Sequence, residues 1–562
     1  MGRPLLEVRH LSIQFVGGRS PWRPVVSDVS FQLSSGETLA VVGESGSGKS
    51  LTALAVMGLL PPGARASGHI VWQGQEIQDW PEKQWRKLRG RDMGMVFQEP
   101  MSSLNPLLTC GYQTAEVLRV HEGLTAREAK KRTLQLFESV RLPDPERIWR
   151  SYPHQVSGGQ KQRVMIAMAM ACHPRLLIAD EPTTALDATV QREILELFRG
   201  LQKQYGMGLL FISHDLMLVQ ELAHRVLVMY QGRAVETGPV HQVMETPEAA
   251  YTRGLLACRP PLTGRPARLP MLEDFLQAEK KSTESIKVPK FPKPTEKVLL
   301  KVENLNVRYP IKYNWMGRAA EWLEAVKDVS FSVHEGEVLG LAGPSGCGKS
   351  TLGRAVLALQ PVYSGRVLFK DQDLLRLNPS DLRKIRREIQ VVFQDPYAAL
   401  NPRLRVGEAI AEPIRVHRLA PDGRSARHKA MELLEKVGLK PEHYDRFPHE
   451  FSGGQRQRIC IARALSVQPS FLVCDESVAA LDVSVQAQIL NLLNDLRAEM
   501  GLSFLFISHD LNVVRYMSHR LCIMHQGTIV EQGPADDIFQ NPQSLYTRSL
   551  LEAIPKPQKN VL

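Results

Sequence analysis

Two glycine-rich segments have the residue types and spacing that bind phosphate. Residues 43–50 and 343–350 both read GxxxxGKS, and each lies between an apolar run and a helical pattern. Glycines let backbone N–H groups surround phosphate oxygens, and the start of the following helix adds positive potential. The lysine meets the β- and γ-phosphate oxygens, and the final serine ligates Mg²⁺. Two such matches in register predict two nucleotide sites. The predicted contacts are Gly43, Ser45, Gly46, Gly48, Lys49, Ser50 and Leu51 in the first segment, and Gly343, Ser345, Gly346, Gly348, Lys349, Ser350 and Thr351 in the second.

An acidic pair follows an apolar run downstream of each phosphate-binding segment. Asp180 and Glu181 end the run LLIADE, and Asp475 and Glu476 end the run FLVCDE. The first carboxylate of each pair would hold Mg²⁺, and the second would polarise the attacking water. A strand-end Asp-Glu pair alone is more simply a solvated turn. Its position after a phosphate-binding segment favours the catalytic interpretation.

Three further polar motifs occur once in each half of the chain. Gln98 and Gln394 follow the apolar runs GMVF and QVVF, and His214 and His509 follow LLFIS and FLFIS. The sequence SGGQ opens a helical run in each half, so its hydroxyl and its glycine amides can form a second anion site at a helix start. Alone, SGGQ is a capping loop and the histidine a surface turn residue, but the shared order favours function. The second anion sites would consist of Ser157, Gly158, Gly159 and Gln160, and of Ser452, Gly453, Gly454 and Gln455.

The elements that position these motifs are repeated. All motifs recur in the same order about 295 residues later, which indicates two homologous domains. Short apolar runs alternate with helical patterns in each copy, and this predicts an α/β fold with a mostly parallel sheet. The motifs fall at strand ends, where α/β folds bind ligands. The domains are expected at 1–257 and 298–562, joined by a proline- and lysine-rich linker at 258–297. The linker is expected to be a mainly extended tether, in which LEDFLQAEK is compatible with one short helix.

The composition excludes several other classes of protein. A chain of 562 residues with 43% apolar residues can form two domains with buried cores. No apolar run approaches the roughly 18 residues of a membrane-spanning helix, and the start lacks a secretory signal, so a cytosolic location is expected. Seven scattered cysteines form no CxxC pair for a zinc or iron–sulfur site. The net charge of +11 suits nucleotides, anionic lipid or nucleic acid without deciding between them.

The ordered set of phosphate loop, FQ, SGGQ, acidic pair, ALD and SHD resembles the ATPase domain of ABC transporters over nearly all of both halves. The resemblance implies two tandem domains, each a mostly parallel sheet core with an antiparallel β part and a helical subdomain. In this family the domains pair head to tail, so ATP on one phosphate loop is capped by the partner's SGGQ. One site would combine Lys49, Ser50, Gln98, Asp180, Glu181 and His214 with Ser452 and Gly454, and the other would combine Lys349, Ser350, Gln394, Asp475, Glu476 and His509 with Ser157 and Gly159.

The resemblance also implies roles for single residues. Phe15 and Tyr309 lie where the family stacks an aromatic ring on adenine, although a strand aromatic is more often a core residue. Asp187 and Asp482, in the ALD segments, would communicate across the domain interface. Both copies keep every polar catalytic residue, so two hydrolysing sites are expected, and Ser477 replaces the usual proline in the second copy. Ser50, Gln98 and Asp180 would ligate Mg²⁺ at one site, and Ser350, Gln394 and Asp475 at the other.

Four further segments resemble the ATPases of peptide and nickel importers, specifically the fused form in glutathione and microcin-type peptide uptake: EPMSSLNP, DPYAALNP, PEAAYTRGLLA and PQSLYTRSLLEA. This resemblance implies an ATPase at the cytoplasmic face of the bacterial inner membrane, bound to two transmembrane permease subunits. An external solute-binding protein would deliver the cargo, and no nucleic acid would be involved. A dipeptide, oligopeptide, glutathione, peptide antibiotic or metal–chelator complex all remain open as cargo, because the ATPase does not contact it.

Two other classes of tandem ABC ATPase also lack membrane spans. Soluble ABC proteins that act on ribosomes join their domains by a longer, highly charged helical arm, whereas residues 258–297 are interrupted by prolines. DNA-repair ABC ATPases carry inserted zinc-binding cysteines, which this sequence does not have. The ribosome factor is the alternative hypothesis.

Overall fold

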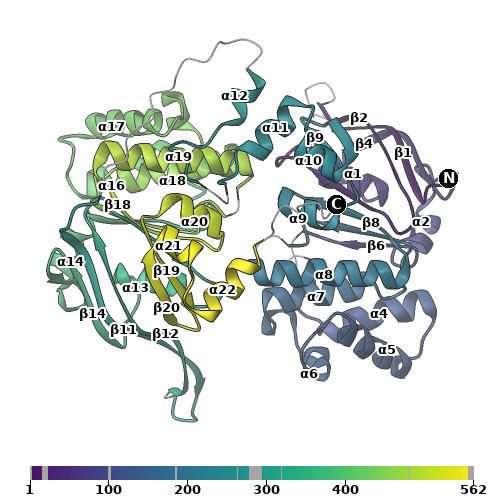
Figure 1. Cartoon of the computed structure of the whole chain (residues 1–562), viewed down its shortest axis with the longest axis horizontal. Helices are drawn as coiled ribbons and strands as arrows, with labels where there is room; N and C mark the ends of the chain where they lie inside the picture. Colours follow the sequence, from purple (N-terminus) through teal and green to yellow (C-terminus); the bar gives the residue numbers. More distant parts are fainter. Residues whose placement is uncertain are drawn as a thin grey trace. The chain divides into compact units, whose positions relative to one another are not determined.

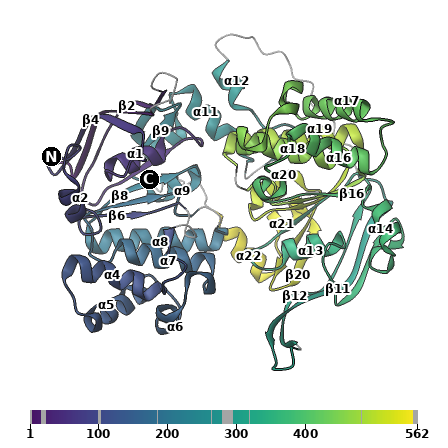
Figure 2. The ribbon, with the colours of Figure 1, turned by 180° about the vertical axis from the view of Figure 1, so that it is seen from behind.

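The computed structural model describes residues 3–15, 23–98, 103–183, 186–261, 264–277, 294–317, 319–479 and 481–554. The chain divides into two compact units, which are coloured from purple to teal and from teal to yellow in Figure 1 and are seen from behind in Figure 2. Residues up to 256 form the first unit together with 272–279, and residues 257–271 group with the second. Within the described ranges, no helix has both the length and the apolar character needed to cross a membrane.

Two sheets form the β framework of the first unit. The antiparallel sheet has the order β2-β1-β4-β5, and the larger sheet has the order β10-β9-β3-β8-β7-β6. In the larger sheet, β10 pairs antiparallel with β9, while the other strand pairs are parallel. The carboxyl ends of β3, β7 and β8 therefore lie side by side at the centre of one sheet edge. The strands are β1 (Leu6–Phe15), β2 (Arg23–Leu33), β3 (Thr38–Val42), β4 (Ala64–Trp72), β5 (Gln75–Glu76), β6 (Met93–Val96), β7 (Leu176–Asp180), β8 (Gly208–Ser213), β9 (Arg225–Tyr230) and β10 (Arg233–Pro239).

Helices connect the parallel strands of the first unit. The helix α1 follows β3, α8 follows β7 and α9 follows β8, while α4, α5 and α6 lie between β6 and β7 in sequence and pack with α7 as a helical subdomain. The helices are α1 (Lys49–Val56), α2 (Glu82–Leu88), α4 (Cys110–Glu122), α5 (Ala126–Ser139), α6 (Pro145–Arg150), η1 (Pro153–Gln155), α7 (Gly158–Ala169), α8 (Ala188–Tyr205), α9 (Leu216–Leu222), α10 (Val240–Glu245), α11 (Ala250–Ala257) and α12 (Leu272–Leu276).

The second unit repeats this plan. Its antiparallel sheet has the order β12-β11-β14-β15, and its larger sheet has the order β16-β17-β18-β13-β19-β20. The strands are β11 (Val298–Tyr313), β12 (Ala319–His334), β13 (Val338–Ala342), β14 (Ser364–Phe369), β15 (Gln372–Asp373), β16 (Ile389–Val392), β17 (Phe471–Asp475), β18 (Ser503–Ile507), β19 (Arg520–His525) and β20 (Thr528–Pro534). The helices are α13 (Lys349–Val356), η2 (Leu374–Arg376), α14 (Pro379–Ile385), α15 (Pro396–Ala399), α16 (Val406–Val416), α17 (Gly423–Lys436), η3 (Pro441–Asp445), η4 (Pro448–Glu450), α18 (Gly453–Leu465), α19 (Val483–Met500), α20 (Leu511–Met517), α21 (Ala535–Gln540) and α22 (Leu545–Glu552). The tandem α/β fold expected from the sequence is confirmed.

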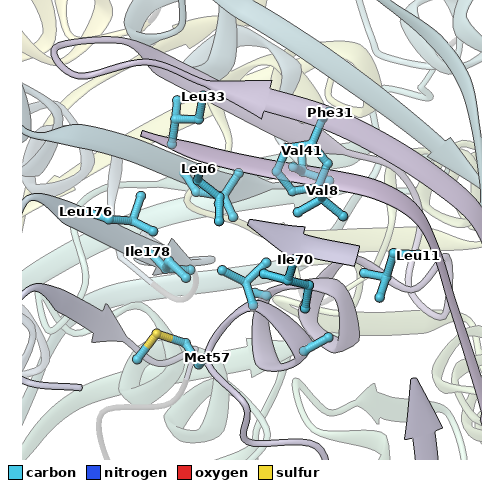
Figure 3. Close-up of a cluster of buried hydrophobic side chains, with 14 of the residues drawn as sticks. Leu6, Val8, Leu11, Phe31, Leu33, Val41, Met57, Ile70, Leu176 and Ile178 are labelled. Atoms are coloured by element: carbon cyan, nitrogen blue, oxygen red, sulfur yellow. The ribbon is translucent and has the colours of Figure 1, made fainter. Parts of the chain in front are cut away.

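A buried apolar cluster joins the two sheets of the first unit and encloses α1. Figure 3 shows Leu6 and Ile70 of the antiparallel sheet near Ile178 of the parallel sheet, with Met57 beyond the end of α1 in the same cluster. All five residues of β3 and of β7 are buried, as expected for parallel strands covered on both faces. An equivalent cluster fills the second unit. Each phosphate-binding segment therefore begins a helix that is anchored in a packed core.

Part of the segment between the two repeats is held by specific side chains of the second unit. Leu269 is 1% exposed. Asn491 on α19 accepts from the Leu269 N–H at 3.0 Å and donates to its carbonyl oxygen at 2.9 Å. Arg268 donates to both carboxylate oxygens of Asp495, also on α19, at 3.1 and 3.0 Å. The described residues 257–261 and 264–271 therefore group with the second unit.

Candidate active sites

The first phosphate-binding segment forms a tight loop between β3 and α1. Gly43 has φ 151°, and a Cβ atom there would lie 2.2 Å from the carbonyl oxygen of Met229, so only glycine fits. Gly48, at φ 96°, begins α1. The buried Lys49 donates from Nζ to the carbonyl oxygens of Gly43 and Glu44 at 2.8 and 2.9 Å. The loop therefore presents backbone amides and one ammonium group at a helix start, which is the arrangement that binds phosphate.

The second phosphate-binding segment repeats this geometry between β13 and α13. Gly343 has φ 155°, and a Cβ atom there would lie 2.2 Å from the carbonyl oxygen of Met524. Lys349 donates to the carbonyl oxygens of Gly343 and Pro344, both at 2.9 Å. In both loops the following serine and glycine are exposed, at Ser45, Gly46, Ser345 and Gly346. The two predicted phosphate-binding loops therefore have the same geometry, one in each unit.

The end of β7 places Asp180 beside the start of α1. Ser50 Oγ donates to Asp180 Oδ1 at 3.0 Å. Burial raises the pKa of Asp180 to about 6, the neighbouring Glu181 adds to this rise, and the Ser50 hydrogen bond and Lys49 partly oppose it. A hydroxyl and a carboxylate oxygen thus converge where the first phosphate loop enters its helix. These are oxygen ligands of the kind that Mg²⁺ prefers.

The second unit brings the matching pair together at the end of β17. Ser350 Oγ donates to Asp475 Oδ1 at 2.8 Å. Burial raises the pKa of Asp475, while the Ser350 hydrogen bond opposes the rise. The two predicted metal-binding pairs therefore have the same geometry and the same direction of pKa change.

Glu181 is held by the two other polar residues predicted for this site. Gln98, after β6, donates from Nε2 to Glu181 Oε2 at 3.0 Å, and His214 Nδ1, after β8, lies 3.1 Å from the same oxygen. Glu181 itself has φ 46°, an uncommon conformation for a residue with a side chain. Three neighbouring strand ends thus fix one carboxylate at the sheet edge. Such strained, over-determined positions are typical of functional sites.

Glu476 is contacted by the matching glutamine and histidine and lies close to the phosphate-loop lysine. Gln394 Nε2 donates to Glu476 Oε2 at 2.7 Å, His509 Nδ1 lies 3.5 Å from that oxygen, and Lys349 Nζ lies 3.8 Å from Oε1. Burial alone would raise the pKa of Glu476, but His509 and Lys349 together lower it. Burial lowers the pKa of His509, but its contact with Glu476 outweighs this and raises it. The carboxylate is therefore kept ionised, as a group that orients and polarises a water molecule must be.

Each SGGQ segment begins a helix as the sequence predicts. Ser157 is the N-cap of α7: its hydroxyl accepts from the Gln160 N–H at 3.3 Å, and Gln160 Oε1 accepts from the Ser157 N–H at 3.1 Å. Ser452 and Gln455 form the same capping box at α18, at 3.4 and 3.1 Å. Both serines, Gly158 and Gly453 are exposed. Each helix start therefore offers amide donors on the surface of its own unit.

The second glycine of each SGGQ segment packs against the helix that the predicted ALD aspartate begins. A Cβ atom at Gly159 would lie 3.0 Å from Val190 of α8, and one at Gly454 would lie 2.3 Å from the matching valine of α19. Asp187 is the N-cap of α8 and accepts from the Val190 N–H at 3.1 Å. Asp482 is the N-cap of α19. The SGGQ helix and the helix that the aspartate begins therefore pack closely together within each unit.

The predicted adenine-contacting aromatics lie at strand positions near the phosphate loops. Phe15 is the last residue of β1 and is half-buried. Tyr309 on β11 is 40% exposed, and its hydroxyl donates to Gln360 Oε1 at 2.7 Å. Gln360 in turn donates to the carbonyl oxygen of Thr351 on α13 at 3.1 Å. Tyr309 is therefore tied to the helix that begins at the second phosphate loop, whereas Leu51, the counterpart of Thr351, packs against the apolar core.

One contact of the first phosphate loop was missed by motif reasoning. The hydroxyl of Tyr251 on α11 accepts a hydrogen bond from the Glu44 N–H at 3.2 Å. Tyr251 belongs to the segment PEAAYTRGLLA, which had served only as a mark of family resemblance. The available signal was the recurrence of YTR in both halves, but nothing in its spacing indicates which loop it reaches.

Comparison with known protein families gives two matches. The ABC transporter model matches residues 26–184 and 326–479. The model of the oligopeptide/dipeptide transporter C-terminal region matches residues 235–282 and 530–561. Both models match twice, once in each repeat.

Comparison with individual proteins gives relatives over nearly the whole length. The glutathione import ATP-binding protein GsiA of Escherichia coli (strain K12) is 47% identical over 567 residues, which cover 98% of this chain and 89% of that protein. The protein of the same name from Shigella sonnei (strain Ss046) gives the same identity and coverage. Among solved structures, a dimeric post-hydrolysis state of the ATP-binding cassette MJ0796 bound to ADP and Pi is 31% identical, with a TM-score of 0.39, and covers 42% of this chain and 98% of that one.

Proposed function

We propose that the chain, which belongs to the ABC transporter family of ATPases, powers import of glutathione or a related small peptide. Each repeat also carries the C-terminal region that is typical of oligopeptide/dipeptide transporters. In this proposal both repeats, hereafter the first and second cassettes, hydrolyse ATP. The energy drives a membrane permease that the chain does not contain.

The observation that carries the proposal is the environment of the two glutamates. In each cassette a glutamate follows the acidic strand end and is contacted by a glutamine and a histidine from neighbouring strand ends. The phosphate-loop lysine begins the adjacent helix. A carboxylate fixed near a phosphate cradle is suited to orient water for attack on a γ-phosphate. This supports Glu181 and Glu476 as the catalytic residues, with His214 and His509 holding them.

The residues beside each phosphate loop fit Mg²⁺. Ser50 with Asp180, and Ser350 with Asp475, would hold the ion, and Gln98 and Gln394, which contact the glutamates next to these aspartates, would contribute an amide oxygen. When bound, Mg²⁺ neutralises charge on the phosphate oxygens. The raised pKa values of both aspartates fit this assignment, because a buried carboxylate gains most from a cation.

We further propose that each ATP is enclosed by residues of both cassettes. Ser452, Gly454 and their neighbours would cap the nucleotide on the first phosphate loop, and Ser157 and Gly159 would cap the nucleotide on the second. The exposed SGGQ helix starts support this role, because their backbone N–H groups can donate hydrogen bonds to an anion. They are separate in sequence from the phosphate-loop lysine of the same cassette. Closure of the two cassettes on ATP would then move the permease, and hydrolysis would reset it.

The partners follow from the same family membership. We propose two transmembrane permease subunits, contacted near Gln98 and Gln394, and a binding protein outside the membrane that delivers the cargo. The chain would lie at the inner face of the cell membrane, held there by the permease. The proposed cargo is glutathione because the full-length relatives described above carry that name. The alternative of a ribosome-associated tandem ATPase has no support from these relatives.

The catalytic assignment is tested by Glu181→Gln and Glu476→Gln in the full chain, reconstituted with its permease in liposomes. Each substitution keeps the size of the side chain but removes the negative charge that polarises water. We expect each single variant to remove the phosphate release of its own site, about half of the total, and the double variant to fall to background, while ATP binding persists in all three. Normal turnover in either variant would contradict hydrolysis at both sites.

The cargo assignment is tested separately in the same liposomes. We expect ATP-dependent accumulation of labelled glutathione in the presence of the binding protein, and none with the double variant Glu181→Gln, Glu476→Gln. Accumulation of labelled dipeptide but not of glutathione would leave the ATPase assignment intact and overturn the cargo.

A further inference from the structure

The first phosphate loop is contacted by a residue from the C-terminal region of its cassette. Tyr251 lies on α11, inside residues 235–282, which match the oligopeptide/dipeptide C-terminal model. Its side chain is 3% exposed, and its hydroxyl accepts from the Glu44 N–H at 3.2 Å. The bond reaches the main chain of the loop, so it acts on the position of the loop itself.

The ring of Tyr251 is held in place by stacking. Its centroid lies 4.2 Å from that of Tyr230, the last residue of β9, with 30° between the ring planes. The preceding residue of β9, Met229, places its carbonyl oxygen against Gly43. Stacking therefore fixes the Tyr251 hydroxyl next to the loop, so that the side chain loses little further freedom when the hydrogen bond forms.

The residue that Tyr251 contacts also positions the phosphate-binding lysine. The Glu44 carbonyl oxygen accepts from Lys49 Nζ at 2.9 Å and from the Ser47 N–H at 3.1 Å. One residue thus joins Tyr251 on its amide side to Lys49 on its carbonyl side. Movement of this residue would displace the lysine that meets the nucleotide.

The second cassette has the matching stacked tyrosine but no equivalent of the hydrogen bond from the Glu44 N–H. Tyr546 stacks on His525, the last residue of β19, with centroids 3.8 Å apart and 27° between the planes. Pro344 stands at the position of Glu44 and has no N–H group to donate. The backbone around it is otherwise equivalent, because Gly343 has φ 155° against 151° for Gly43. The two sites differ here by one hydrogen bond that the second cannot form.

We propose that Tyr251 is a positioning residue for the first ATP site, and that it makes nucleotide affinity at this site, and not at the second, dependent on the C-terminal segment. This inference rests on the proposed binding of ATP at residues 43–50. It gives a physical role to the first of the two YTR segments and predicts an asymmetry between sites whose polar catalytic residues are the same.

The test isolates each site within the full chain. In a Lys349→Ala background only the first site binds ATP, and in a Lys49→Ala background only the second does. We expect Tyr251→Phe to weaken ATP binding at the first site roughly two- to tenfold, the range of one net hydrogen bond. The matched variant Tyr546→Phe should leave binding at the second site within twofold. Titration calorimetry with ATP and Mg²⁺ provides the dissociation constants.

A double-mutant cycle separates this role from a general loss of structure. In a Glu44→Ala background, which keeps the N–H, Tyr251→Phe should lower ATP affinity by the same factor as it does with Glu44 present. In a Glu44→Pro background, which removes the N–H, Tyr251→Phe should leave ATP affinity unchanged. The Michaelis constant for ATP should rise more than the turnover number falls. An equal effect of Tyr251→Phe in both Glu44 backgrounds would overturn the proposal.

The Lys49→Ala and Tyr251→Phe variants distinguish a failure of the proposed ATP site from a failure of the proposed role of Tyr251. If Lys49→Ala leaves binding in the Lys349→Ala background unchanged, the assignment of ATP to residues 43–50 fails. If Lys49→Ala abolishes that binding but Tyr251→Phe has no effect, only the role of Tyr251 fails.

Discussion

Asp180 carries a buried charge that its own surroundings do not fully stabilise. It is 5% exposed, and burial raises its pKa to about 6 despite the Ser50 hydrogen bond. Because its pKa is higher in the folded protein than in the unfolded chain, folding favours the protonated form. The ionised carboxylate therefore costs stability at neutral pH, in exchange for a site that can bind a cation.

We expect Asp180→Asn to stabilise the protein in the absence of nucleotide and metal while abolishing hydrolysis at the first site. The amide keeps an oxygen for the Ser50 hydroxyl but carries no charge. The gain should be on the order of 2 kcal/mol at pH 7.5 and about half of that at pH 5. Below the unfolded pKa of Asp the difference should vanish, because both forms of the protein then hold the proton.

Thermal unfolding of the variant and the parent at pH 5 and pH 7.5 measures this difference. Asp79→Asn, at an exposed position, is the control and should shift neither curve. A variant less stable than the parent at pH 7.5 would show that the buried charge is compensated within the fold.

At the residue scale the sequence predicted most of the site. Motif order and strand-end position were enough to bring Gln98, Asp180, Glu181 and His214 together at one sheet edge, because parallel strands share their carboxyl ends. Tyr251 could not be found this way. Its hydroxyl reaches a backbone amide across more than 200 residues of sequence, and such a contact leaves no pattern in either segment.

The segment that connects the repeats is an element in its own right. Sequence composition predicted a mainly extended tether at 258–297, whereas residues 257–271 group with the second unit and are fixed by Asn491 and Asp495. A polar side chain that pairs with a buried backbone has no periodic signal, so composition alone could not reveal it. The length of the β11–β12 hairpin was likewise not predicted from the sequence. The inserted residues near Trp315 extend β11 to 16 residues, against 10 for β1.

We expect Asn491→Leu to release this segment without unfolding the second cassette. The substitution leaves the N–H and C=O of Leu269 without their partners, at a cost of about 1–3 kcal/mol. Local opening should therefore accelerate trypsin cleavage after Arg268, at the Arg268–Leu269 bond, roughly fivefold or more.

Mass spectrometry of a trypsin time course on the full chain checks this expectation. Gln486→Ala, on the same helix, is the control and should leave the cleavage rates unchanged. Equal rates for Asn491→Leu and the parent would mean that the Asn491 contacts do not hold the segment.

At the scale of the whole molecule, the repeat is the main feature. Each cassette assembles a proposed phosphate loop, a proposed metal-binding pair and a glutamate contacted by a glutamine and a histidine from its own strand ends, and each also presents an SGGQ helix start. We propose that each phosphate loop works with the SGGQ helix start of the other cassette, so that neither cassette alone completes a site. The duplicated cassettes would then depend on each other, because hydrolysis at either site needs residues of both cassettes.

The most direct measurement of this claim combines Ser452→Arg with the loss of one lysine in the full chain. Ser452 is exposed, and the arginine blocks the amide donors at the start of α18. If the sites are shared crosswise, Ser452→Arg damages the first site. The double variant with Lys49→Ala should then keep the phosphate release of Lys49→Ala alone, and the double variant with Lys349→Ala should fall to background. The reverse pattern, with activity lost in the Lys49→Ala pair and kept in the Lys349→Ala pair, would show that each cassette uses its own SGGQ segment and would contradict the account.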